Sequence, residues 1–248
     1  MLTRYQLQWT LVIALLLCSW MATQAAAGQN AATLSFAFKF PGASPSQYRI
    51  LVNADGKGEY QSSGADSSPQ RLASPFAGSS SGSGDGSEDS GAAGSDEPYR
   101  TNFSLSSSAR ERIFSLAAAA HYFDGDFDFR KKHLANTGEK TLAYSDATRH
   151  YQATYNYSTN EAVTQLTAFF QQLSTTLETG RRLQYLYDHA QLGLDEELKR
   201  AGELRGSSQL TEIEVLAPIL QRIASDPGVM HVARQHAQKL LDEAASQP

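Results

Sequence analysis

The chain has 248 residues, a net charge of −5 and a single cysteine, Cys18. One cysteine rules out intramolecular disulfides and metal sites built from several thiolates. The acidic balance argues against nucleic acid and against an anionic membrane surface as partners. A chain of this length without disulfides must be held together by a buried apolar core.

The first 27 residues have the features of a secretory signal peptide. Arg4 supplies a positive start, residues 11–18 form a short apolar core, and the alanines at 25–27 are typical of a cleavage site. The apolar run at 9–21 falls short of the roughly 20 residues that a membrane-spanning helix needs, although an uncleaved anchor stays open. We expect an exported protein, periplasmic or extracellular, that is not stably inserted in a membrane once the signal is removed.

Alternating apolar residues predict three strands after this segment. Residues 32–40 place four apolar side chains on one face, the pattern of a half-buried strand: Leu34, Phe36, Phe38 and Phe40. Residues 48–52 predict a second strand, and Asp55-Gly56 favours a tight turn into a third strand that starts at Lys57. The three strands would form a β-meander.

Residues 61–98 differ sharply in composition from the flanking segments. They hold twelve serines, seven glycines and six acidic residues against one basic residue, Arg71. Such a segment buries too little apolar surface to offset the entropy of ordering it. We expect a disordered insert within one domain, because the preceding piece is too short to form a core of its own.

A strand, a helix and a second hairpin are predicted after the insert. The strand covers 99–105, and serines 106–108 then offer helix N-caps, with Ser108 and Glu111 at capping-box spacing. The helix stripe ends near Ala120. Beyond an acidic loop, residues 140–145 and 148–157 predict two hairpin strands.

The remainder of the chain shows helical periodicity. The spacing predicts helices over 160–177 and 181–204, with Gly180 as a break or bend between them. Two further helices are expected at about 211–225 and 227–244, the first kinked by Pro218.

The order of elements predicts an α+β fold. An antiparallel sheet, formed by the meander and then a β-α-β-β-α unit, would carry helices on one side, followed by an α-helical tail. The predicted domains are the signal peptide at 1–27, an α+β domain at 28–178 that contains the insert, and the tail at 179–248 with a helical hairpin at 211–244.

Two resemblances accompany this pattern. The segment 34–177 carries Asp55-Gly56, Phe103-Ser104-Leu105, Tyr122-Phe123-x-Gly125-Asp126-Phe127-Asp128 and Thr141-Leu142-x-Tyr144. It resembles uncharacterised exported bacterial proteins with a ββαββα domain of unknown function, which implies a fold and a compartment but no activity. The tail segment 216–241, with Asp226-Pro227 at its turn, is similar to one HEAT-type helical hairpin, which implies protein binding.

The acidic loop after the first helix is the first candidate for chemistry. Asp124, Asp126 and Asp128 alternate as at the start of a calcium loop. However, Phe129 stands where glycine is required and Ala135 where glutamate is required, so a solvated turn is the favoured interpretation. These carboxylates could also act as an acid and base pair.

Histidine and tyrosine supply the remaining candidate binding residues. His121 ends a helix, where the dipole favours its charged form. Tyr151, Tyr155 and Tyr157 share a strand face, which could stack against a sugar or a peptide or be covered by a helix. No motif for a cofactor or a structural metal was found, so none is expected.

Two functions follow from these observations. The preferred hypothesis is a non-enzymatic module that binds protein partners in the cell envelope. The alternative is a small hydrolase or carbohydrate-active protein that uses Asp124, Asp126 and Asp128.

Overall fold

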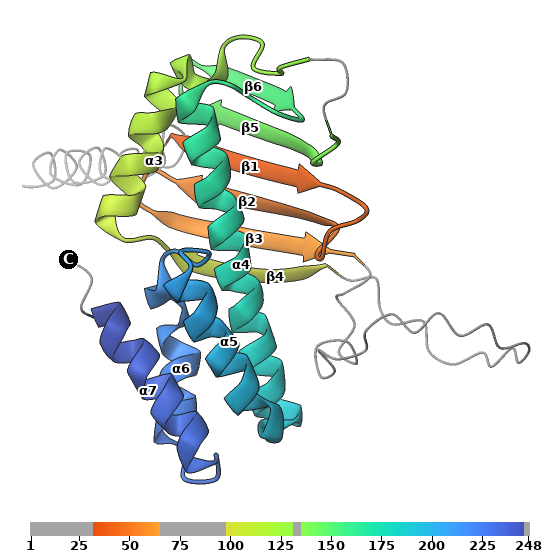
Figure 1. The fold of residues 1–248 in the computed structure, drawn as a ribbon. Helices are drawn as coiled ribbons and strands as arrows, with labels where there is room; N and C mark the ends of the chain where they lie inside the picture. Colours follow the sequence, from red (N-terminus) through yellow and green to blue (C-terminus); the bar gives the residue numbers. More distant parts are fainter. Residues whose placement is uncertain (1–31, 65–97, 131–134, 246–248) are drawn as a thin grey trace, which may run out of the picture.

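The computed structural model describes residues 32–64, 98–130 and 135–245. The predicted signal peptide and nearly all of the predicted insert lie outside these ranges. The described residues form a six-stranded antiparallel sheet, five α-helices and a helical C-terminal region, which confirms the predicted α+β class (Figure 1).

The sheet contains every predicted strand, in the spatial order β4-β3-β2-β1-β5-β6. The first three strands form the predicted meander, and β3 extends to Ser63, past the predicted start of the insert. The strand bounds are β1 Thr33–Lys39, β2 Gln47–Asn53, β3 Lys57–Ser63, β4 Tyr99–Ser104, β5 Glu139–Ser145 and β6 His150–Tyr155.

Two helices, α3 (Ser107–Ala119) and α4 (Glu161–His189), cover one face of this sheet (Figure 1). Alternate strand residues turn toward them, and Phe36 of β1 stacks on Phe170 of α4 with ring centroids 5.3 Å apart. Full burial of such a side chain stabilises the fold by roughly 1.5–3 kcal/mol. This packing forms the larger of two hydrophobic clusters.

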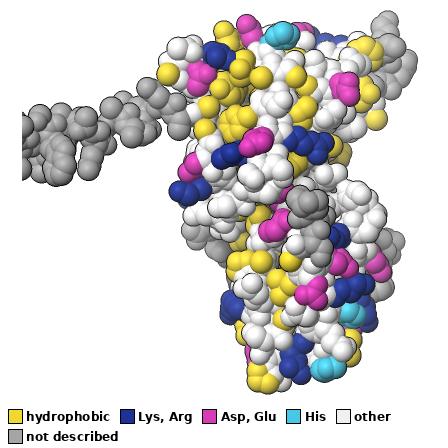
Figure 2. Space-filling model, turned by 90° about the vertical axis from the view of Figure 1, so that its left-hand side faces the viewer, with side chains coloured by type: hydrophobic (Ala, Val, Ile, Leu, Met, Phe, Trp, Pro, Cys, Tyr) yellow, Lys and Arg dark blue, Asp and Glu magenta, His cyan; other side chains and the backbone are white. Residues whose placement is uncertain are grey.

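The second hydrophobic cluster lies in the helical tail, which forms the narrower, lower part of the molecule in Figure 2. It begins at Leu183, within α4, so that one long helix contributes to both clusters. The predicted domain boundary at 178/179 falls inside this helix. The tail elements are η3 Gln191–Gly193, α5 Leu194–Gly206, η4 Ile213–Leu216, α6 Ala217–Ser225 and α7 His231–Ala245.

The expected helix break at Gly180 is wrong, because α4 runs through it to His189. A Cβ at Gly180 would lie 2.9 Å from Cδ2 of Leu216, so this glycine allows a close approach of the tail. The chain breaks instead at Ala190, which has φ −152° and ψ 59°.

Two other helix starts differ from the expectation. The N-cap of α3 is Ser106, one of the three serines expected to offer N-caps, and its Oγ accepts a hydrogen bond from the Ala109 N–H at 3.2 Å. The capping-box candidate Ser108 lies inside the helix instead. Pro218 does not kink a helix, because α6 starts at Ala217 and places the proline in its first turn, where no N–H is needed.

A buried carboxylate joins the sheet to α4. Glu178 accepts hydrogen bonds from the Tyr60 hydroxyl at 2.8 Å and the Ser62 hydroxyl at 2.6 Å. Its other oxygen lies 3.4 Å from the Arg181 guanidinium, and only 9% and 12% of the two side chains are exposed. The hydrogen bonds from Tyr60 and Ser62 therefore tie α4 to β3.

Candidate functional site

The face of the sheet opposite α3 and α4 is covered by no helix or strand of the described chain (Figure 1). The strand residues on this face alternate with the core residues and are mostly polar. We call it the uncovered face. A polar surface built on rigid strands can hold side chains in fixed positions for binding.

The strand register arranges this face in rows that run across the strands. One row contains six residues, each the cross-strand partner of the next: Arg100, Gln61, Arg49, Ala37, Thr141 and Thr154. We call it the arginine row. It contains two cations and no acid.

The guanidinium groups of Arg49 and Arg100 make no ion pair with any described residue, and both residues are exposed. Adjacent strands are about 4.8 Å apart, so these two arginines, separated by β3, stand roughly 10 Å apart with Gln61 between them. The remaining side chains of the row project little from the sheet, because Ala37 and the two threonines are small.

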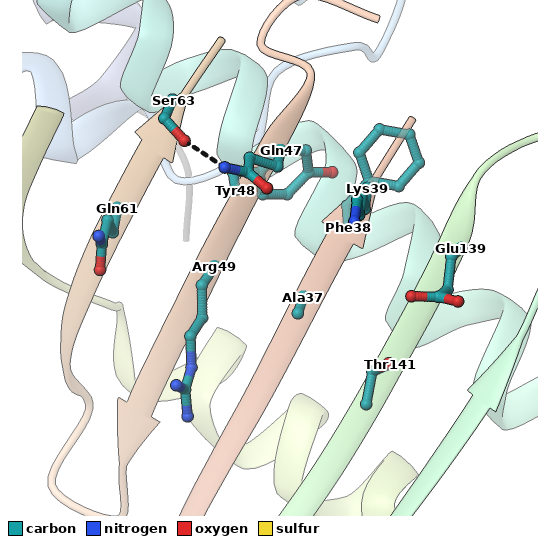
Figure 3. A pocket seen from close by; sticks show the side chains of 10 residues that line it. All are labelled: Ala37, Phe38, Lys39, Gln47, Tyr48, Arg49, Gln61, Ser63, Glu139 and Thr141. Atoms are coloured by element: carbon teal, nitrogen blue, oxygen red, sulfur yellow. Dashed lines mark hydrogen bonds between the residues drawn. The ribbon is translucent and has the colours of Figure 1, made fainter. Parts of the chain in front are cut away.

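A hollow of about 320 Å³ lies over this row and the row beside it. Figure 3 looks onto the uncovered face, with Arg49 and Gln61 on neighbouring strands and the helices behind the sheet. Gln47 donates a hydrogen bond to the Ser63 hydroxyl at 2.7 Å at the rim. The other residues that line it are Ala37, Phe38, Lys39, Tyr48, Glu139 and Thr141.

The predicted acidic loop lies at the end of this surface, beside a second hollow of about 620 Å³ lined in part by Asp128 and Arg130. Asp128 accepts a hydrogen bond from the Asn156 N–H at 2.9 Å and pairs with Arg130 at 3.0 Å. The hydrogen bond from the Asn156 N–H, and to a smaller extent that from Arg130, hold the pKa of Asp128 below its usual range.

Asp126 also stabilises the acidic loop. It accepts a hydrogen bond from the Asp128 N–H at 3.0 Å and lies 3.9 Å from Arg130, and Asp124 is exposed beside it. Asp126 thus closes a local turn, whereas Asp128 ties the loop to the residue that follows β6. Within the described ranges, no three His, Cys, Asp or Glu side chains come together as metal ligands.

His121 opens an unusual turn of backbone. His121, Tyr122 and Phe123 have φ values of 50°, 57° and 72°, which place three consecutive non-glycine residues in the left-handed region. Each such residue costs on the order of 1–2 kcal/mol. Tyr122 is held in place by contacts with two neighbours, the Tyr144 ring at 4.6 Å and the Arg149 guanidinium at 4.0 Å.

The tyrosine face of β6 turns toward α4 rather than toward the uncovered face. Tyr155 is 3% exposed, its hydroxyl lies 2.6 Å from that of Thr167, and burial raises its pKa to about 12. Tyr151 and Tyr157 are 38% and 46% exposed. Tyr151 and Tyr155 share a strand face but differ in burial, and neither lies in the arginine row.

The arginine row was not predicted from the sequence. Its six members come from six strands, three before the insert and three after it, so their neighbourhood depends on pairing that no single strand reveals. The available signal was the alternation itself, since Arg49 and Gln61 occupy positions that alternate with the buried residues of their strands.

The site and fold together define an α+β protein with one helix-covered sheet face, one uncovered polar face and a helical tail. No family model and no curated protein matches this chain. No helix in the described part combines the length and apolar character needed to cross a membrane.

Proposed function

We propose that this protein is an exported, non-enzymatic binding module of the cell envelope that docks a partner protein on its uncovered face. The observation that carries the proposal is the asymmetry of the sheet. One face is packed against α3 and α4, whereas the other offers hollows and exposed polar side chains on rigid strands.

The signal-peptide features of residues 1–27 support the proposed export. The resemblance of 34–177 to exported bacterial proteins of unknown function points the same way. The helical tail would then hold the binding face in a fixed orientation through Glu178, or contact a second partner, as its likeness to a HEAT-type hairpin suggests.

The hydrolytic alternative finds less support in the geometry. Asp126 accepts a hydrogen bond from the loop backbone, and Asp128 accepts hydrogen bonds from the Asn156 N–H and from Arg130. Nδ1 of His150 lies 2.7 Å from the Ser145 hydroxyl. A catalytic carboxylate pair needs to reach a substrate proton with one member acting as acid and the other as base. The observed bonds favour a role in shaping the end of the sheet.

Photo-cross-linking in native cells tests the proposal. A photoreactive residue at Thr141 should give a discrete adduct with a partner protein, because Thr141 lines the hollow on the uncovered face. The matched control is Ser115, exposed on the opposite side in α3, which should give no adduct of that size. Adducts from Ser115 alone, or from neither position, would refute the proposal.

A further inference from the structure

We infer that the segment docked on the uncovered face is an acidic, extended peptide read by Arg49 and Arg100. This inference rests on the proposed function and adds the chemistry of the partner. It starts from two exposed guanidinium groups that have no carboxylate partner among the described residues and that flank Gln61 in one row.

Charge complementarity identifies the ligand class. The arginine row carries two positive charges and no acid, and neither arginine has an ion-pair partner among the described residues, so the row presents net positive charge to a ligand. A guanidinium donates two parallel N–H bonds to a carboxylate, and such charge-assisted bonds are about twice as strong as neutral ones. Gln61 adds an amide that can donate to a peptide carbonyl.

The neighbouring rows favour a narrow occupant. Glu59 lies one row to one side, next to Asn102 and Leu51, and Glu139 lies one row to the other side, next to Lys39. Residues two apart in a strand are about 6.8 Å apart, so both carboxylates would face a flat anionic surface such as a membrane. A single extended chain laid along the arginine row avoids direct contact with them.

The shape of the row suits a peptide laid across the strands. Beyond Arg49 the row continues with shorter side chains, first Ala37 and then Thr141 and Thr154. The hydroxyls of the two threonines are hydrogen-bonded to each other at 2.9 Å. The hollow over Arg49, Ala37 and Thr141 provides a surface on which such a chain can lie. The arginines would hold the acidic end, and the threonines would contact the remainder through hydrogen bonds.

Fluorescence anisotropy with labelled peptides tests this inference on the chain from Gly28 onward. A twelve-residue peptide rich in glutamate should bind at least tenfold more tightly than its matched peptide with glutamine at each glutamate. Arg49→Gln and Arg100→Gln should each weaken binding about tenfold, the loss expected for one charge-assisted contact. The control Arg112→Gln, on exposed α3, should change binding by less than about twofold.

Three results would overturn the inference. The two peptides could bind alike, Arg112→Gln could weaken binding as much as Arg49→Gln, or vesicles with anionic phospholipid could bind the chain with the same arginine dependence. If the Thr141 cross-link persists alongside any of these, the docking face stands and its ligand chemistry is wrong. If the cross-link is also absent, the proposed function fails.

Discussion

At the scale of single residues, the fold depends on polar groups that are buried with partners. Glu178 is the clearest case, since Tyr60, Ser62 and Arg181 all direct polar atoms at its carboxylate. Glu178→Ala would remove the carboxylate that accepts the hydrogen bonds of the buried Tyr60 and Ser62 hydroxyls, and should lower the free energy of unfolding by about 3 kcal/mol. Urea unfolding measures the change.

The matched control for that substitution is Glu203→Ala in α5, where the side chain is exposed. It should change the free energy of unfolding by less than about 0.5 kcal/mol. Equal effects of the two substitutions would show that the bonds from Tyr60 and Ser62 to Glu178 do not hold α4 to the sheet.

Asp146 gives a pH dependence of known sign. The N–H groups of Thr148 and Arg149 each donate to its Oδ1 at 2.8 Å, and the Thr148 bond is the main reason that its pKa falls from 3.8 to about 2. Because the folded-state pKa is lowered, the ionised carboxylate stabilises the turn fully above about pH 4, and this stabilisation is lost as the pH falls through about 2.

Amide exchange by NMR checks this expectation. Protection of the Thr148 and Arg149 amides should decrease between about pH 4 and pH 2 in the native chain. In Asp146→Asn, whose side chain accepts the same bonds without titrating, protection should stay level over this range. A loss of the same size in the variant would assign the acid sensitivity to another group.

At the scale of elements, the left-handed turn 121–123 makes a prediction that runs against helix propensity. His121→Gly should raise the free energy of unfolding by up to about 1 kcal/mol, because glycine adopts a φ of 50° at no steric cost and the His121 side chain is exposed. Ser115→Gly, in right-handed α3, should lower it by about 0.5–1 kcal/mol. Equal losses in both variants would mean that the turn stores no strain.

Two helical glycines form another matched pair. A Cβ at Gly202 in α5 meets nothing within 4 Å, so Gly202→Ala should stabilise the chain by about 1 kcal/mol. Gly180→Ala gains the same propensity but crowds the buried Leu216, and should be about 1–2 kcal/mol less stable than Gly202→Ala. Thermal unfolding separates the two, and equal gains would contradict the close packing at Gly180.

These elements show which parts of the fold the sequence could predict. The strands follow from a period-two pattern because each has one buried face, as in Leu34, Phe36 and Phe38. Gly180 was misread because its role depends on Leu216, far along the chain. The turn at 121–123 carries no glycine, so nothing local predicted its positive φ values.

The candidate site was harder to predict than the fold for a related reason. The acidic loop was found as a segment, but its bond to Asn156 is a tertiary contact. The arginine row exists only in the register of strands separated by up to about half of the described chain. Local patterns report which face a side chain takes, whereas neighbours across a sheet are set by pairing.

At the scale of the whole molecule, the proposed export predicts a shortened chain. Protein isolated from native cells should begin at Gly28, because the alanines at 25–27 suit cleavage there. N-terminal sequencing or intact-mass measurement detects the loss of 27 residues. A chain that retains Met1 in the cytoplasm would contradict the proposed localisation.

The central claim is that the uncovered face is occupied where the protein works. Cys18 is the only cysteine, so after Cys18→Ser single-cysteine variants can be labelled cleanly. The maleimide labelling rates of Thr141→Cys and Ser115→Cys are measured in native envelope. Each rate is then divided by the rate of the same variant in purified protein. The account predicts that only Thr141→Cys is slowed severalfold in the envelope. Equal normalised rates at both positions would contradict it.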